Sequence, residues 1–139
     1  MTQEEKQLLL KDLCGRLPYG VKVLIPECRQ DIATLIGIDD KLFTVKYDES
    51  IIYCPFSINI KPYLRPMSSM TDEEKTYIKN RWGVNEFGDI ELEDNSNLVD
   101  LSDIRNFIDW LNKKMFDYRG LIPKGAALEA PDEMYKMEE

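Results

Sequence analysis

The chain has 139 residues, of which 43% are hydrophobic, and a formal net charge of −8, a composition that predicts one globular domain over residues 1–139. It contains no histidine and only three cysteines, which excludes Ser-His-Asp and Cys-His catalysis and a four-ligand zinc site of the usual nitrogen and sulfur type. Charged residues interrupt every apolar run, and acidic residues precede the first one, so the pattern predicts neither a membrane helix nor a secretory signal.

The N-terminal part of the sequence predicts a helix followed by a β-meander. Thr2 and Glu5 form a capping-box pattern that begins a helix within residues 1–17, and Gly15 and Pro18 are expected to end it. Beyond it, apolar residues alternate with polar ones, which indicates short strands. We expect these strands over residues 19–25, 31–38, 42–47, 51–53 and 57–61.

The spacing of two also predicts which strand residues share a face. In the second strand, Ile32, Ile36 and Ile38 lie on a common face. Tight acidic turns separate the strands, and this layout favours a small antiparallel meander over 19–61, either SH3-like or a partly open barrel.

The segment after the meander predicts an extended linker and a helix. Pro62 and Pro66 make the KPYLRP segment extended and remove ladder donors from it. Thr71 with Glu74 forms a second capping box, which predicts a helix over 71–82.

The remaining C-terminal part predicts one strongly amphipathic helix and an arm. Apolar residues at i, i+3, i+4 and i+7 predict a helix over 101–115, whose apolar stripe we expect to pack on the sheet. Glycines and prolines interrupt the sequence that follows, so we expect an ordered, irregular arm and tail over 116–139. The fold class is therefore α+β, with a meander flanked by an N-terminal helix and two C-terminal helices.

The negative charge is concentrated in the C-terminal part of the chain. Residues 1–82 contain 12 acidic and 12 basic residues, whereas residues 83–139 contain 14 acidic and 6 basic ones. Within the turn-rich segment 84–99, the candidate partner-binding residues are Glu86, Asp89, Glu91, Glu93 and Asp94. Such a surface repels nucleic acid and attracts a basic protein partner.

The same acidic segment partly matches the spacing of a calcium-binding loop, with oxygen-bearing side chains at alternate positions from Asp89 to Asp100. Asp94 stands at the sixth position, where the sharp turn of such a loop needs glycine. A polar strand with an Asn-Ser-Asn turn is the better interpretation, and we expect no metal and no cofactor.

A second candidate binding group lies in the KPYLRP segment. Lys61, Tyr63 and Arg65 interleave bases with an aromatic ring, a combination that can hold a nucleic-acid strand by phosphate contact and base stacking. The alternative is a stiff connector whose Tyr63 and Leu64 seal one end of the sheet.

The three cysteines do not predict a disulfide framework or a catalytic site. Cys14, Cys28 and Cys54 are odd in number and far apart, so we expect reduced thiols that pack as small buried hydrophobic residues in a cytoplasmic protein. No Walker loop, dinucleotide-binding motif or hydrolase motif accompanies them.

Three blocks of the sequence carry a resemblance to a family: MTQEEKQLLLKDLCGRLPYGV, IKPYLRPMSSMTDEE and IDWLNKKMFDYRGLIPKGAALEAPDEMYK. They resemble an uncharacterised family of short proteins from gut bacteria and their phages or prophages. The resemblance covers about half of the chain and transfers no catalytic residue. It implies a constant frame around variable parts at about residues 22–58 and 84–99, and a place in the cytoplasm of a bacterial cell or a phage-infected host.

Three functions remain from the sequence. The lack of histidine and of catalytic motifs, together with the uneven charge, favours a non-catalytic protein-binding or regulatory accessory protein. The second is a nucleic-acid-binding small barrel that uses Lys41, Lys46, Lys61, Arg65 and neighbouring aromatic residues. The third is an enzyme or small-ligand binder that works through carboxylates, tyrosine or cysteine.

Overall fold

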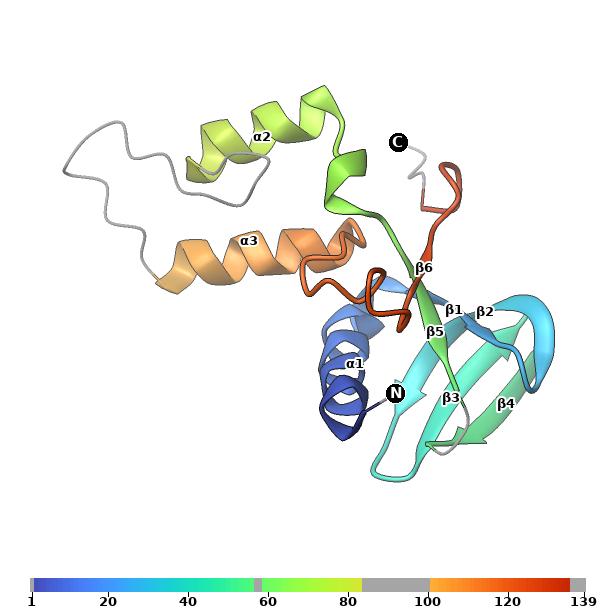
Figure 1. The fold of residues 1–139 in the computed structure, drawn as a ribbon. Helices are drawn as coiled ribbons and strands as arrows, with labels where there is room; N and C mark the ends of the chain where they lie inside the picture. The colour runs from blue at the N-terminus through green and yellow to red at the C-terminus, as the bar shows by residue number, and fades with distance from the viewer. Residues whose placement is uncertain (1, 57–58, 84–100, 136–139) are drawn as a thin grey trace.

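A computed structural model of the protein describes residues 2–56, 59–83 and 101–135. These residues form three α-helices and a six-stranded, mostly antiparallel open sheet, so the predicted α+β class with an N-terminal helix and C-terminal helices is confirmed. Figure 1 shows α1 beside the sheet, α2 and α3 next to each other farther away, and β5 running from the sheet toward them.

The first helix, α1, spans Gln3–Arg16 and begins with the predicted capping box. The Thr2 hydroxyl accepts a hydrogen bond from the backbone N–H of Glu5 at 3.1 Å, and the Glu5 carboxylate accepts one from the backbone N–H of Thr2 at 3.2 Å. Two otherwise unpaired backbone donors are thereby satisfied at the start of the helix.

Gly15 lies inside α1 and does not end it, which corrects the sequence prediction. A Cβ atom at this position would lie 3.2 Å from the Asn112 side chain of α3, so the glycine permits the two helices to approach closely. The chain leaves α1 through a 3-10 helix at Leu17–Tyr19, followed by Gly20 with a φ of 73°. For this reason the first strand begins later than predicted.

The sheet has the strand order β4-β3-β2-β1-β5-β6. Its strands are β1 (Lys22–Ile25), β2 (Arg29–Ile38), β3 (Leu42–Tyr47), β4 (Ser50–Pro55), β5 (Lys61–Leu64) and β6 (Leu128–Glu129). Strands β1 to β4 form the predicted antiparallel meander. The order is linear, with β4 and β6 as the outer strands of the described sheet, so the SH3-like barrel is not confirmed.

The fifth strand lies in a different segment from the one that we predicted. The expected strand was 57–61, whereas β5 lies in the KPYLRP segment that we interpreted as a linker. β5 pairs antiparallel with β1 at Pro62 and Lys61 and parallel with β6. Pro62 is the second residue of this short strand and lies opposite Val23.

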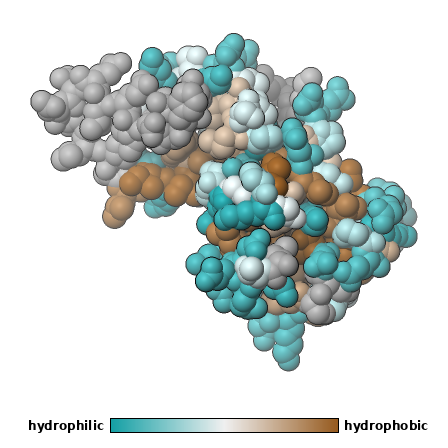
Figure 2. All heavy atoms as spheres, viewed as in Figure 1, coloured by the Kyte–Doolittle hydropathy of each residue, from teal (hydrophilic) through white to brown (hydrophobic). Residues whose placement is uncertain are grey.

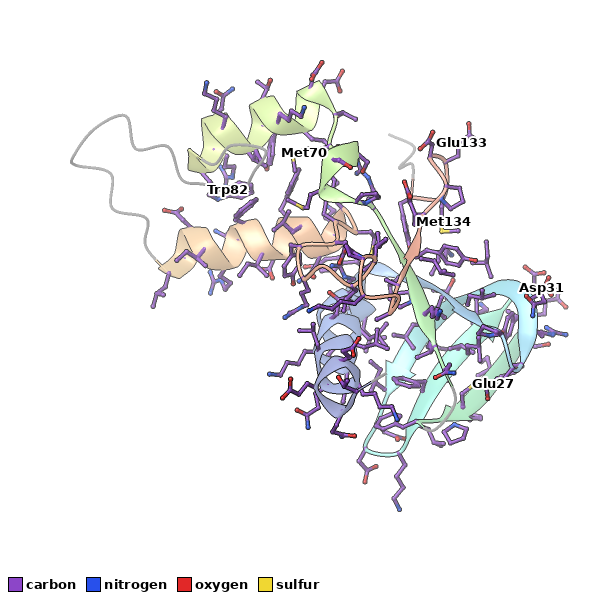
Figure 3. All side chains as sticks on the ribbon, viewed as in Figure 1. Glu27, Asp31, Met70, Trp82, Glu133 and Met134 are labelled. Atoms are coloured by element: carbon purple, nitrogen blue, oxygen red, sulfur yellow. The ribbon has the colours of Figure 1, made fainter. Side chains whose placement is uncertain are left out.

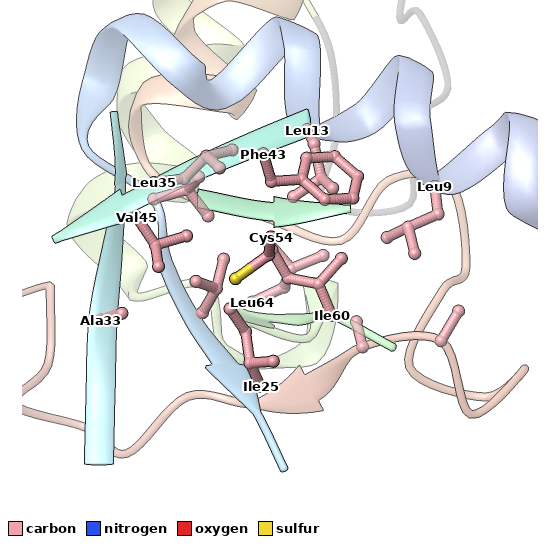
Figure 4. Close-up of a cluster of buried hydrophobic side chains, with 14 of the residues drawn as sticks. Leu9, Leu13, Ile25, Ala33, Leu35, Phe43, Val45, Cys54, Ile60 and Leu64 are labelled. Carbon is pink, nitrogen blue, oxygen red and sulfur yellow. The ribbon is translucent and has the colours of Figure 1, made fainter. Parts of the chain in front are cut away.

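The two faces of the sheet differ sharply in burial. Val21, Val23 and Ile25 are fully buried in the larger of two apolar clusters, which we call the main core. Figure 4 shows this core between α1 and the strands. In β2 the core-facing residues are Ala33 and Leu35, and the predicted common face of isoleucines is the outward one. Ile38, the exception, lies beyond a β-bulge and packs against the core.

The two C-terminal helices, α2 (Asp72–Trp82) and α3 (Leu101–Lys113), form a second apolar cluster. The Trp82 side chain points from α2 toward α3 (Figure 3), where its ring centroid lies 5.2 Å from that of Phe107 and 6.2 Å from that of Trp110. The expectation that α3 packs its stripe on the sheet is therefore wrong. Its large aromatic side chains find similar partners on α2, and they bury apolar area there.

The C-terminal arm folds back onto its own chain. Leu121 and Ala126 are fully buried in the main core, and Phe116 is fully buried in the second cluster. Asp117 fixes the turn between them, because its carboxylate accepts hydrogen bonds from the backbone N–H groups of Leu121 at 2.8 Å and Ile122 at 2.9 Å. The described part of the arm, 116–135, contains the short strand β6 and links the two clusters.

A buried ion pair connects α1 to this arm. Arg16 and Asp12 are both fully buried, and the Arg16 guanidinium donates two hydrogen bonds to the Asp12 carboxylate at 2.8 and 3.0 Å. The same guanidinium donates to the backbone carbonyl of Phe116. Arg16 and Arg119 lie over the Tyr118 ring, at 5.3 and 5.1 Å from its centroid.

Replacing Asp12 with alanine is expected to lower the free energy of unfolding by about 3–5 kcal/mol, because Arg16 would stay buried without its carboxylate. Urea unfolding followed by circular dichroism measures this change. The exposed neighbour Lys11 provides the control, and Lys11→Ala should change stability by less than about 0.5 kcal/mol. A loss below about 1 kcal/mol for Asp12→Ala would contradict the structural role of the pair.

Candidate protein-binding surface

The structure places only some of the sequence-predicted binding residues. Glu86, Asp89, Glu91, Glu93 and Asp94, together with the calcium-loop alternative, lie outside the described residues. Lys61 and Tyr63 lie on β5, and Arg65 directly follows it. These last three residues do not form one exposed group, as their individual contacts show.

Arg65 is part of the joint between β5 and α2. Its guanidinium donates two hydrogen bonds to the Glu74 carboxylate, at 2.7 and 2.9 Å, and lies 4.1 Å from the centroid of the Phe116 ring. Glu74 also accepts the backbone N–H of Thr71 in the second capping box, at 3.0 Å. The edge of the guanidinium binds Glu74 and its planar face lies over the Phe116 ring. Arg65 therefore has a structural role and is not available to bind a phosphate.

Glu74 is held ionised by this joint. Burial opposes ionisation, but the hydrogen bonds from Arg65 and Thr71 and the Arg65 charge outweigh it, so the pKa of Glu74 lies below its ordinary value of 4.5. A carboxyl group with a lowered folded-state pKa contributes stability above its ordinary pKa, and that contribution is lost as pH falls through the lowered value.

Glu74→Gln is expected to lower the free energy of unfolding at pH 7 by about 1–2 kcal/mol, since it removes a charge-assisted bidentate contact. The difference from wild type should shrink as pH falls below 4.5, the ordinary pKa. Thermal unfolding measured over this pH range tests both statements. Glu73→Gln, at an exposed position one residue earlier, is the control and should show neither effect.

Tyr63 also has a structural contact. The Tyr135 hydroxyl donates a hydrogen bond to the backbone carbonyl of Tyr63 at 2.7 Å and accepts one from the backbone N–H of Lys22 at 2.7 Å. Burial raises the pKa of Tyr135 above its ordinary value. The arm is thus fastened across β1 and β5, and Lys61–Leu64 takes part in the sheet as a paired strand.

The outward face of β2, β3 and β4 carries an exposed apolar surface that the sequence analysis did not identify as a site. It contains four large apolar residues on two of these strands: Ile32 (48% exposed), Ile36 (44%), Ile51 (53%) and Tyr53 (66%). Residue pairing places Tyr53 opposite Thr44. We call these four residues the outward apolar face.

The register explains how these residues come to share one face. Lys22, Thr34, Lys46 and Ile51 are opposite one another in adjacent strands from β1 to β4, and directly paired residues lie on the same side of a sheet. The buried residues of the same strands occupy the other positions. In Figure 1, α1 is on one side of the sheet, and α2 and α3 lie far from β4.

A second group of exposed apolar side chains lies on α3. Figure 2 shows apolar atoms gathered along this helix, and Leu101, Ile104 and Ile108 are 83%, 42% and 38% exposed. This helix begins directly after residues 84–100, which are outside the described part of the chain. The outward apolar face is formed by described residues alone and is therefore the better-defined surface.

The cysteines and buried tyrosines do not form a reactive site. Cys54 is buried as predicted, whereas Cys14 and Cys28 are exposed, which corrects the expectation for these two. Burial raises the pKa of Cys54, and burial and the neighbouring Cys28 raise the pKa of Tyr47 to about 12. A raised pKa keeps both groups protonated near neutral pH, whereas a nucleophile needs the opposite shift.

The described residues contain no group of three or more cysteine and carboxylate side chains that could hold a metal ion. None of the described helices has both the length and the apolar character needed to cross a membrane. Comparison with protein-family models, curated proteins and solved structures found no match to this chain.

Proposed function

We propose that this protein is a non-catalytic protein-binding or regulatory accessory protein whose outward apolar face contacts a protein partner. The observation that supports this proposal is that Ile32 and Ile36 of β2 and Ile51 and Tyr53 of β4 are all exposed, among the described residues, on the same face of the sheet. They flank β3, whose residues on this face are Thr44 and Lys46. Single exposed apolar residues are common on protein surfaces, whereas contiguous groups are typical of interaction sites.

The size of the face indicates what it contributes. Fully burying an exposed Ile or similar side chain is worth about 1.5–3 kcal/mol, so these half-exposed residues contribute about 1 kcal/mol each. The sum of about 4 kcal/mol is at the lower limit of what association costs in lost translational and rotational freedom. The apolar face therefore gives contact area, and stable binding requires polar contacts in addition.

The sequence suggests further parts of the proposal. A basic partner would suit the net charge of −8 and the acidic segment 84–99. Free cysteines at Cys14, Cys28 and Cys54 suit a reducing cytoplasm, in a bacterial cell or a phage-infected host. A phage- or prophage-encoded accessory role follows from the family resemblance of the three sequence blocks.

One observation favours a nucleic-acid-binding function as the second candidate. Among the described strands, the charged residues at outward positions of β1, β3 and β5 are Lys22, Lys46 and Lys61. Of these, Lys46 lies on β3, the strand paired with that of Tyr53, and such a lysine can contact a phosphate while the ring stacks on a base. Branched aliphatic side chains occupy most of the remaining face, however, and these do not stack on bases, so protein binding ranks first.

Replacing Ile32 and Ile36 with threonine should weaken capture of protein partners by about tenfold or more. The change removes two apolar contacts of about 1 kcal/mol each and keeps β-branched side chains in the strand. Affinity capture from a lysate of its own cells, quantified by mass spectrometry, measures the effect. Ile104→Gln, on the similarly exposed helix surface, is the control.

Equal capture by the double variant and the wild type would refute the outward apolar face as the binding site. Binding of single-stranded DNA or RNA at low salt, lost in Lys22→Gln and Lys46→Gln variants and unaffected by the threonine changes, would favour the second candidate, because phosphate-driven affinity is greatest at low salt.

A further inference from the structure

The outer strand β4 has one backbone edge that no described strand occupies. It pairs with β3 through Leu42↔Pro55 to Tyr47↔Ser50 and stands last in the strand order. The N–H and C=O groups of an unpaired edge can form hydrogen bonds with another extended segment, which is how many peptide-binding domains extend a sheet.

The hydrogen-bond alternation shows which residues of β4 face this edge. The backbone N–H of Phe56 donates to the carbonyl of Lys41 at 3.3 Å, just beyond the Leu42↔Pro55 pair. In antiparallel strands, hydrogen-bonded pairs alternate with pairs whose backbone groups point away from each other. The backbone groups of Ile51 and Tyr53 therefore point away from β3, toward the free edge.

The middle of the free edge carries none of the features that usually protect an edge strand. Natural edge strands carry lysines, prolines or bulges that prevent pairing. Here the central residues are Ile51, Ile52 and Tyr53, with Pro55 only at the end of the strand. Pro55 falls at a position where its nitrogen faces the free edge, so its missing N–H removes no bond to β3.

Charges at the two ends of β4 indicate the chemistry of an occupant. The turn before the strand contains Asp48 and Glu49, and the turn beside its far end contains Asp39, Asp40 and Lys41. Four carboxylates thus stand against one lysine at the ends. Asp39 accepts the backbone N–H groups of Lys41 and Leu42, at 2.8 and 2.7 Å, and these hydrogen bonds lower its pKa.

We propose that an extended segment of a partner protein, with alternating apolar residues and basic residues at its ends, adds to the free edge of β4. This inference rests on the proposed protein-binding function and names the mode of binding. Backbone hydrogen bonds to Ile51 and Tyr53 supply the polar contacts that the outward apolar face lacks. The apolar side chains of the segment then lie beside those of Ile51 and Tyr53.

The same charges disfavour a second copy of this chain as the occupant. Antiparallel pairing of β4 with its own copy would bring Asp48 and Glu49 of one chain toward Asp39 and Asp40 of the other. Parallel pairing would place Asp48 and Glu49 beside themselves. Both arrangements bring like charges together, which is a common means of preventing edge-to-edge association.

The probe for the test is a synthetic peptide of alternating valine and threonine that matches the six residues of β4, with lysines at both ends. Amide hydrogen exchange followed by NMR should slow at Ile51 and Tyr53 when the peptide is added. The Ile52 amide, which already faces β3, should change little. A peptide with glutamates at its ends should bind at least about threefold more weakly at low salt.

Two matched changes separate edge pairing from side-chain contact. Methylating the peptide nitrogens that face β4 should weaken binding about tenfold, because backbone hydrogen bonds are lost while the protein is unchanged. In the protein, Tyr53→Pro removes the N–H that faces the edge, and Tyr53→Ala retains it. The proline variant should therefore bind the peptide more weakly than the alanine variant.

Several outcomes would overturn strand addition. These are unchanged exchange at Ile51 and Tyr53, equal binding of the methylated peptide, or equal binding of the glutamate-ended peptide. Slowed exchange that depends on protein concentration without peptide would show a second copy as the occupant. If Ile32 and Ile36 variants lose partner capture while Tyr53→Pro keeps it, the proposed function stands and strand addition fails.

Discussion

The buried contact between Arg16 and Asp12 is the constraint on which the arrangement of the other elements depends. Arg16 is the last residue of α1. Its guanidinium donates hydrogen bonds to Asp12 and to the backbone carbonyl of Phe116, and it lies over the ring of Tyr118. It therefore fixes the helix that covers the main core to the arm that leaves α3. A buried charge is costly unless it is paired, and the contacts of Arg16 with Phe116 and Tyr118 require this arrangement of helix and arm.

A second set of contacts, made by Arg65, connects the arm to the sheet. Arg65 donates its backbone N–H to the carbonyl of Met115 at 2.7 Å, and its own carbonyl accepts the N–H of Asp117 at 2.8 Å. Its side chain binds Glu74 at the start of α2. The end of β5, the arm and α2 are held by one residue, which explains how two separate apolar clusters form one molecule.

Local patterns in the sequence predicted the elements well, and their tertiary placement less well. Both capping boxes and the four meander strands depend on neighbouring residues, which the sequence displays directly. The strand at Lys61–Leu64 depends on pairing with β1 and with residues 128–129, far away in sequence. Because prolines usually interrupt ladders, the local pattern favoured a linker there.

The candidate site was hidden from the sequence for a related reason. Alternation identified Ile32 and Ile36 as sharing a face, but it could not say which face turns inward, since both faces of β2 carry apolar residues. The residues paired with β2 on its neighbouring strands decide which face turns inward. Ala33 lies opposite Val23 and Leu35 opposite Val45, and both valines are fully buried. Arg65, by contrast, looked available because its partner Glu74 serves first as a helix cap.

The elements that pack on the sheet leave the outer edge of β4 without a described neighbour. Helix α1 covers the inward face of the sheet, and the arm adds β6 beside β5 and fastens Tyr135 across β1. Among the described strands, all except the outer strands β4 and β6 have a neighbour along both edges. An element that covered β4 would satisfy the backbone groups of Ile51 and Tyr53 and bury their side chains together. The described residues supply covering elements at the β6 side of the sheet, so the β4 edge is the place where the proposed strand addition would extend it.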